Sequence, residues 1–134
     1  MAEATPVHPN IARYRRMMTA FNANDLSVIH EVVAEHVEYI VPGKSAIAGH
    51  THDIAGLISM LRRGKELSGG SLQLELRSVV ADDQYLFVYG RIHAERLGRV
   101  LDTDHCVVFR FEHEKIVEGR TVPVDLYEFD AFWS

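Results

Sequence analysis

The sequence predicts an α+β protein, a conical barrel of three N-terminal helices packed on a curved, mostly antiparallel β-sheet around an internal pocket. Apolar residues recur every three or four positions up to about residue 67, which indicates helices. Beyond residue 71 they recur at every second position, which indicates half-buried strands. Helices followed by a run of long strands are typical of a helical layer laid over one face of an antiparallel sheet.

The first two expected helices lie before residue 36. Pro9 opens a helix whose apolar side chains share one face: Ile11, Tyr14, Met17, Met18 and Phe21. Asn24 and Asp25 are expected to end this helix and to cap the second one. The second helix has an apolar stripe formed by Leu26, Ile29, Val32 and Val33.

A strand is expected over residues 36–41, and Pro42-Gly43 stops it. The small residues up to Gly49 then form a loop. A third helix begins near Asp53 and ends at the breaker Ser68-Gly69-Gly70.

Four strands are expected in the C-terminal half. Leu72, Leu74 and Leu76 alternate with polar residues and mark the first of them. The others cover residues 85–95, 101–112 and 116–124, and Leu97-Gly98 forms the hairpin between the middle two. The last residues, DLYEFDAFWS, form an aromatic tail or a helical turn.

Composition and charge restrict the partners and the location. With 134 residues the chain is expected to be one domain, residues 1–134, of which 1–9 are flexible. The net charge of −5 and the lack of a basic stripe argue against nucleic acid and membrane as partners. We expect no signal peptide at this N-terminus, and the sequence has no apolar run of about 20 residues. The single cysteine, Cys106, fits a reducing compartment, so we expect a cytoplasmic protein.

The hairpin register decides which side chains face the pocket. If Leu97-Gly98 is a two-residue turn, Arg91 lies opposite Asp104 and His93 opposite Asp102. The more apolar face, assigned to the pocket, then carries His105 as its titratable group. A turn one residue longer would break this pairing. The Arg91 and His93 pairs are cross-strand ion pairs on the outer face, or a catalytic relay if the assignment of faces is inverted.

Several segments together resemble the SnoaL-like family of the nuclear transport factor 2 and ketosteroid isomerase superfamily. They are FNANDLSVIHEVVAEHVEYIVPGKSAIAG, HDIAGLISMLRR, LGRVLDTDHCVVFRFEHEKIVEGR and VDLYEFDAFW, and the likeness covers residues 10–133. It implies a fold called cystatin-like or nuclear transport factor 2-like. It implies no single reaction, because the superfamily includes isomerases, polyketide cyclases, epoxide hydrolases, dioxygenase small subunits and non-catalytic binders.

The catalytic residues of two relatives do not carry over. The polar positions of ketosteroid isomerases match Met17, Val41 and Val107, which are all apolar here. The positions of the epoxide hydrolases match Arg91, His93 and about Val122, so only the arginine is kept. The resemblance therefore argues against both of these mechanisms.

His105 and Tyr39 are the candidate catalytic residues. A buried, neutral His105 can act as a base, and the Tyr39 hydroxyl can polarise a carbonyl. The alternatives are a satisfied core histidine and an aromatic residue that only lines the wall. The expected pocket-lining residues are Met17, Val41, His50, Val107, Phe109 and Trp133.

We expect neither a metal nor a cofactor. His50 and His52 could share a metal, but the sequence offers no evident third ligand, and helix capping explains Asp53. Cys106 is expected to pack, without a reactive role.

Two functional hypotheses remain. In the first, the protein is a cofactor-independent isomerase-like, cyclase-like or hydrolase-like enzyme that acts on a polycyclic or terpenoid-like substrate through His105 and Tyr39. In the second, it is a non-catalytic ligand-binding, dimerisation or accessory module. Both imply a hydrophobic small molecule as partner, and family likeness together with an apolar outer face implies a homodimer.

Overall fold

Six strands form one curved sheet in the order β2-β1-β6-β5-β4-β3 in the computed structural model, which describes residues 7–134. The strands are β1 (Val33–Val41), β2 (Gly49–Thr51), β3 (Gln73–Ala81), β4 (Tyr85–Arg96), β5 (Arg99–Glu112) and β6 (Lys115–Pro123). All neighbours are antiparallel except β1 and β6. The α+β class and the mostly antiparallel sheet are confirmed.

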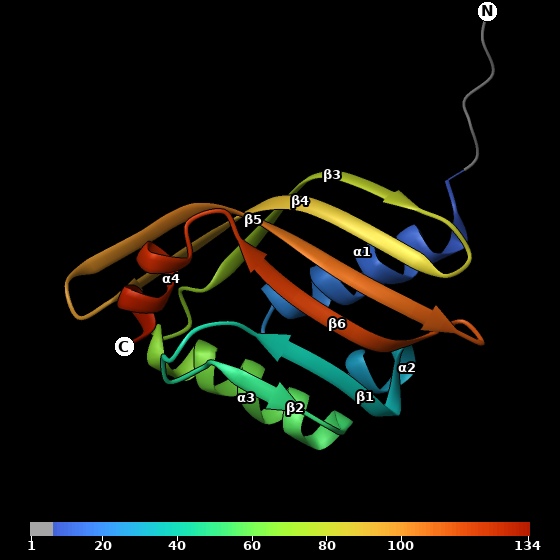
Figure 1. Ribbon diagram of the computed structural model, residues 1–134, viewed down its shortest axis with the longest axis horizontal. Coiled ribbons are helices and arrows are strands. Elements are labelled where there is room, and N and C mark those ends of the chain that lie inside the picture. Colours follow the sequence, from blue (N-terminus) through green and yellow to red (C-terminus); the bar gives the residue numbers. More distant parts are fainter. Residues whose placement is uncertain (1–6) are drawn as a thin grey trace, which may run out of the picture.

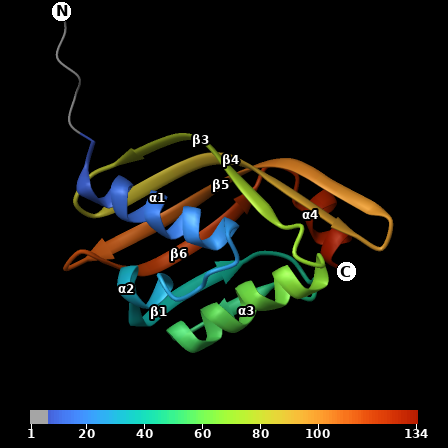
Figure 2. The same ribbon diagram turned by 180° about the vertical axis from the view of Figure 1, so that it is seen from behind.

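Within residues 7–134, four helices accompany the sheet: α1 (Pro9–Asn22), α2 (Ile29–Val32), α3 (Ile54–Leu67) and α4 (Leu126–Trp133). The first three cover the concave face of the sheet, and α4 lies at one end beside the β4–β5 hairpin (Figures 1 and 2). Of the segment 1–9 that was expected to be flexible, residues 1–6 lie outside the described residues, and α1 begins at Pro9. The aromatic C-terminal segment, which was expected to be a tail or a helical turn, forms the helix α4.

The region between α1 and β1 differs from the expectation. Asn24 adopts a left-handed conformation, with a φ of 63°. The Asp25 carboxylate accepts hydrogen bonds from the backbone and hydroxyl of Ser27, and no side chain caps α2. The predicted capping of α2 by Asp25 is therefore wrong, because the carboxylate closes a local turn that precedes the helix. The strand begins at Val33, three residues before the expected start, and this shortens α2 to one turn.

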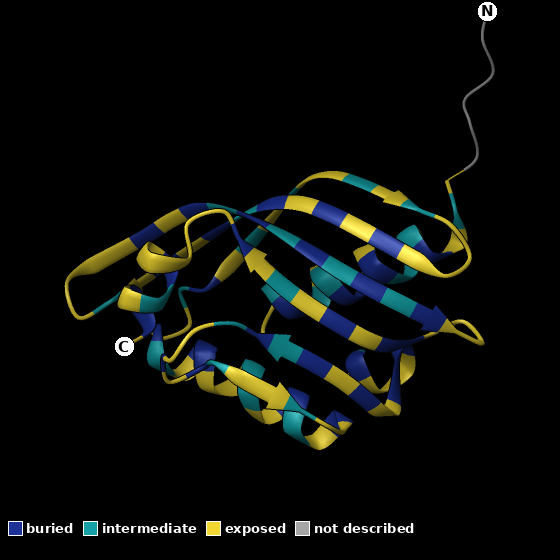
Figure 3. Cartoon of the chain, viewed as in Figure 1, coloured by how far each residue is buried: buried dark blue, intermediate teal, exposed yellow. Residues whose placement is uncertain are grey.

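The β4–β5 hairpin has the predicted register. Leu97 and Gly98 have φ angles of 52° and 75°, as a two-residue turn with two left-handed residues requires. Arg91 pairs with Asp104, and His93 pairs with Asp102. Buried and exposed residues alternate along both strands (Figure 3). His105 and Val107 therefore face the helices, and Arg91 and Asp104 lie on the outer face.

In the described part of the chain no helix is long and apolar enough to cross a membrane. The cytoplasmic location stays a prediction.

Candidate functional site

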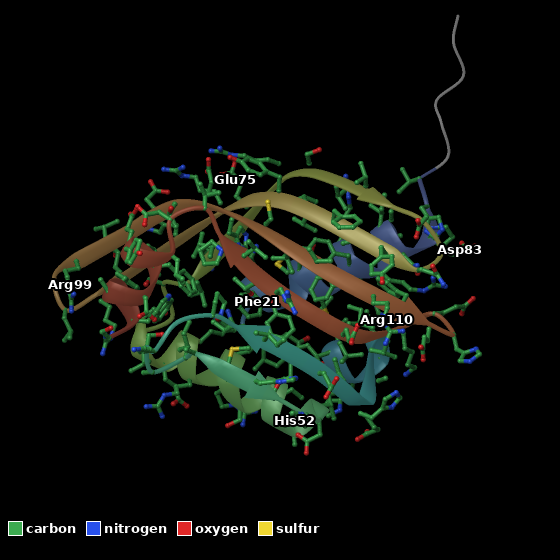
Figure 4. All side chains as sticks on the ribbon, viewed as in Figure 1. Phe21, His52, Glu75, Asp83, Arg99 and Arg110 are labelled. Carbon is green, nitrogen blue, oxygen red and sulfur yellow. The ribbon has the colours of Figure 1, made fainter. Side chains whose placement is uncertain are left out.

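A cavity of about 120 Å³ lies between the helices and the concave face of the sheet. Its wall takes side chains from α1, α2, α3 and α4 and from β1, β3, β4, β5 and β6. Phe21 projects into this space in Figure 4. The wall is almost entirely apolar, and its polar exceptions are the groups that can determine what binds: Tyr14, Tyr39, His105, Thr121 and Trp133.

His105 stands in the middle of β5 and is 3 % exposed. Its partner on β4 is Gly90, where an added Cβ atom would lie 3.4 Å from Nε2 of His105 and 2.3 Å from the Glu75 carbonyl oxygen. Burial lowers the pKa of His105 to about 4, and the nearby Asp104 carboxylate only partly opposes this. The imidazole is consequently neutral at pH 7.

Two cavity-lining residues each have a buried polar atom without a hydrogen-bond partner among the described residues: Nδ1 of His105 and Nε1 of Trp133. Leaving a buried polar atom unpaired costs about 1–3 kcal/mol. Buried polar atoms without a partner are rare in native proteins. A bound ligand with a complementary hydrogen-bonding group would explain them here.

Tyr39 supplies the second polar group of the cavity. Its hydroxyl lies 2.5 Å from Oγ1 of Thr121, and either oxygen can donate. Burial raises the pKa of Tyr39 to about 12, although the hydrogen bond with Thr121 acts in the opposite direction. The hydroxyl therefore keeps its proton at neutral pH and can donate it to an acceptor.

Tyr14 and Thr121 are cavity residues that the sequence analysis did not single out. Burial raises the pKa of Tyr14, and the neighbouring Tyr39 raises it further. The helical repeat had assigned Tyr14 to the apolar face of α1, and only its hydroxyl could have marked it as a functional candidate. Thr121 comes beside Tyr39 through the parallel β1–β6 pairing, which is not visible in the sequence.

The structure brings most of the predicted pocket residues together. The cavity wall contains both candidate catalytic residues, His105 and Tyr39, and five of the expected lining residues: Met17, Val41, Val107, Phe109 and Trp133. The three positions that match the polar residues of ketosteroid isomerases are thus in the wall and are apolar. Arg91 and Val122 are on the outer face, away from the cavity.

His50 was expected to line the pocket, and this prediction is wrong. It belongs to the short edge strand β2 and pairs with Ile40, whose side chain points away from the cavity. Alternation along β1 directs Tyr39 and Val41 inward, so Ile40 and its partner face outward. The His50 side chain is 43 % exposed and lies beside Glu38.

α4 closes one end of the cavity with Phe129 and Trp133. The Asp130 carboxylate accepts hydrogen bonds from the backbone N–H groups of Lys44 and Ser45. The Trp133 carbonyl accepts one from Ala46. These bonds fasten the C-terminal helix to the loop between β1 and β2, so Trp133 is 1 % exposed.

Comparison with known proteins agrees with the fold. A family model described as SnoaL-like domain matches residues 14–119. The uncharacterised protein Rv0034 of Mycobacterium tuberculosis is 29 % identical over 122 residues, which cover 90 % of this chain and 92 % of the relative. Solved structures that superpose on the chain include proteins described as cystatin-like or nuclear transport factor 2-like in fold.

Two further solved structures are informative. Bal32a, from a soil-derived mobile gene cassette, is 32 % identical with a TM-score of 0.89, over 93 % of this chain and 96 % of that one. A protein of Jannaschia sp. CCS1, a candidate SnoaL-like polyketide cyclase by name, is 14 % identical with a TM-score of 0.77, over 100 % and 99 %. At that identity the second likeness concerns the fold alone.

Proposed function

Because this chain belongs to the SnoaL-like domain family, we propose that it binds a small, largely apolar molecule with one hydrogen-bonding group in the cavity. The observation that carries the proposal is the pairing of an apolar wall with two unpartnered polar atoms, on His105 and Trp133. Binding sites for small molecules have this composition, in which apolar area provides affinity and a few polar groups provide orientation.

The cavity volume restricts the size of this molecule. An apolar cavity of roughly 150 Å³ accommodates benzene, and the cavity here measures about 120 Å³. It therefore suits a single ring, and the polycyclic substrate considered from the sequence requires the wall to move. Met17, Met18 and Met60 line it, and their unbranched side chains are the ones that repack most readily.

The first prediction concerns binding of cyclohexanone, a single ring with one acceptor. Trp133 is the only tryptophan, so its fluorescence reports the cavity directly. We expect saturable quenching or a spectral shift with a Kd on the order of 0.1–1 mM, as for a ligand of seven heavy atoms, and a raised Tm. Val107→Phe fills the cavity and should abolish the signal, whereas Val108→Phe, on the opposite face of the same strand, should not. Equal responses of the two variants would refute the proposal.

A second candidate function, proton transfer without a cofactor, is favoured by one observation. The cavity holds a neutral imidazole together with tyrosine hydroxyls that stay protonated. His105 would take a proton from a carbon next to the ligand carbonyl, and Tyr39 or Tyr14 would donate a hydrogen bond to the oxygen as it gains negative charge. A base with a pKa near 4 is weak. The negative charge formed beside the ring raises its proton affinity, because opposite charges attract strongly in a low-dielectric cavity.

The second prediction tests this chemistry with 3-cyclohexen-1-one. Proton removal between the carbonyl and the double bond, followed by proton return at the far alkene carbon, gives the conjugated isomer, which absorbs in the ultraviolet. We expect catalysis that disappears below a pH of about 4, where the imidazole is charged. His105→Leu should lower the rate at least about 100-fold, and His93→Ala, on the outer face, should leave it unchanged. Unchanged turnover in His105→Leu would exclude His105 as the base, and no turnover by the unaltered protein would leave binding as the function.

The third prediction concerns a homodimer formed through the outer face of the sheet. This face exposes aromatic and branched side chains: Tyr85, Phe87, Tyr89 and Val122. Exposed apolar patches on a sheet are typical of association sites. Light scattering should give about 30 kDa, twice the 15.2 kDa of one chain, and Phe87→Lys should reduce it to one chain. A mass of one chain for the unaltered protein at micromolar concentration would exclude the dimer.

A further inference from the structure

Three side chains with metal-binding groups meet at the edge of the sheet, outside the cavity: Glu38 of β1, His50 of β2 and His52, which directly follows β2. One carboxylate oxygen and one nitrogen from each imidazole all lie within 4.8 Å of one another. We propose that these three residues form a binding site for a first-row divalent metal ion, with Zn²⁺ as the best match. The site adds a third ligand to the histidine pair that the sequence alone left without one.

The strand pairing creates this cluster. His50 and His52 are two residues apart in extended chain, so their side chains emerge on the same face. The pairing of Tyr39 with Thr51 and of Ile40 with His50 aligns β2 with β1 so that Glu38 comes beside both rings. In Figure 4, His52 lies at the rim of the molecule, away from the interior.

The distances suit a metal ion with little rearrangement. Oε1 of Glu38 is 3.2 Å from Nδ1 of His52 and 3.7 Å from Nε2 of His50. Two ligands bound at about 2.1 Å to a tetrahedral zinc ion lie about 3.4 Å apart. The ring centroids of His50 and His52 are 4.2 Å apart, so one ion can reach a nitrogen of each. Shifts of less than about 1 Å per ligand would complete the site.

The local charge also favours a cation. In the described chain, the Glu38 carboxylate contacts the two imidazoles and forms no ion pair with an arginine or a lysine. Its partner across the β1–β6 ladder is another acid, Glu118, which is bonded to Arg110. Two imidazoles and one carboxylate are a ligand set that zinc uses when a coordination position stays open to water.

Exposure and position determine what the metal would do. The side chains of His50, Glu38 and His52 are 43 %, 48 % and 68 % exposed, so an ion can enter without unfolding. β2 is joined to β1 by only three residue pairs and leads directly into α3, which lines the cavity. A bound ion would connect the two strands through side chains and hold this edge in place.

The test is a titration of the tag-free 134-residue chain with ZnCl₂ by isothermal calorimetry. We expect one site per chain with a Kd in the micromolar range, and a Tm raised by about 10 °C at a hundredfold excess over Kd. Co²⁺ should give visible absorption bands of a nitrogen- and oxygen-ligated ion. His50→Ala and His52→Ala should each weaken binding at least about 30-fold, and Glu38→Gln about tenfold.

His36→Ala is the matched control, because His36 is an exposed histidine of β1 outside the cluster. It should leave the zinc affinity unchanged. Circular dichroism checks that each variant is folded, which is expected for exposed side chains. Binding that is only millimolar, or that survives both His50→Ala and His52→Ala, would overturn the proposal.

Discussion

Gly119→Ala is expected to lower the free energy of unfolding by about 3 kcal/mol. Gly119 of β6 pairs with Tyr39 on one side and with Phe109 on the other. A Cβ atom there would stand 2.5 Å from two ring carbons of Tyr39 and 2.9 Å from one of Phe109. Overpacking of this kind costs about 1–3 kcal/mol, and the displaced Tyr39 would also loosen its hydrogen bond with Thr121, a further loss of about 1 kcal/mol.

Urea unfolding measures this difference, and thermal unfolding should show a Tm lower by about 10 °C. Gly64→Ala is the matched control, because Gly64 lies inside α3 and an added Cβ meets only Leu72, at 3.4 Å. Alanine is favoured over glycine within a helix by about 1 kcal/mol, so this variant should be as stable as the original or more stable. Equal stability of Gly119→Ala and the unaltered chain would mean that the two rings are not held as described.

The parts of the fold that follow local rules were predictable from the sequence. The Leu97-Gly98 turn sets the β4–β5 register, and the register decides that His105 faces inward. Asp53 caps α3 as expected, because its carboxylate accepts the backbone N–H of Gly56. Such features depend on residues close together in the chain, so periodicity and turn chemistry are sufficient to find them.

The parts that depend on distant pairing were not predictable. β2 has three residues and is a strand only because β1 lies beside it. For the same reason His50 was placed at the pocket and Glu38 was not recognised as its neighbour. The Tyr39–Thr121 contact likewise joins residues 82 positions apart. Apolar patterns identify which face of a strand is buried, but they do not say which strand lies next to it.

The His105 side chain is expected to make the protein less stable as the pH falls from about 6.5 to about 4. In the unfolded chain an imidazole takes up a proton near pH 6.5, whereas in the folded chain burial lowers the pKa to about 4. Between these values the unfolded state binds more protons, so stability rises with pH. The full stability is present above pH 6.5, and about 2–3 kcal/mol of it should be lost between pH 7.5 and 4.5.

His105→Leu isolates this contribution, because it removes the titrating group and the unpartnered Nδ1 atom together. The variant should match or exceed the original at pH 7.5, since an apolar group replaces a buried polar atom without a partner. The difference in free energy of unfolding between the variant and the original, measured by urea unfolding at each pH, should grow as the pH falls to 4.5. Carboxylates with lowered pKa values, such as Asp102 and Asp104, affect both proteins equally and act mainly at still lower pH. Parallel stability curves for the two proteins between pH 7.5 and 4.5 would contradict this prediction. They would show that His105 takes up its proton as readily in the folded chain as in the unfolded one. Such a histidine could not be a neutral base in an apolar cavity.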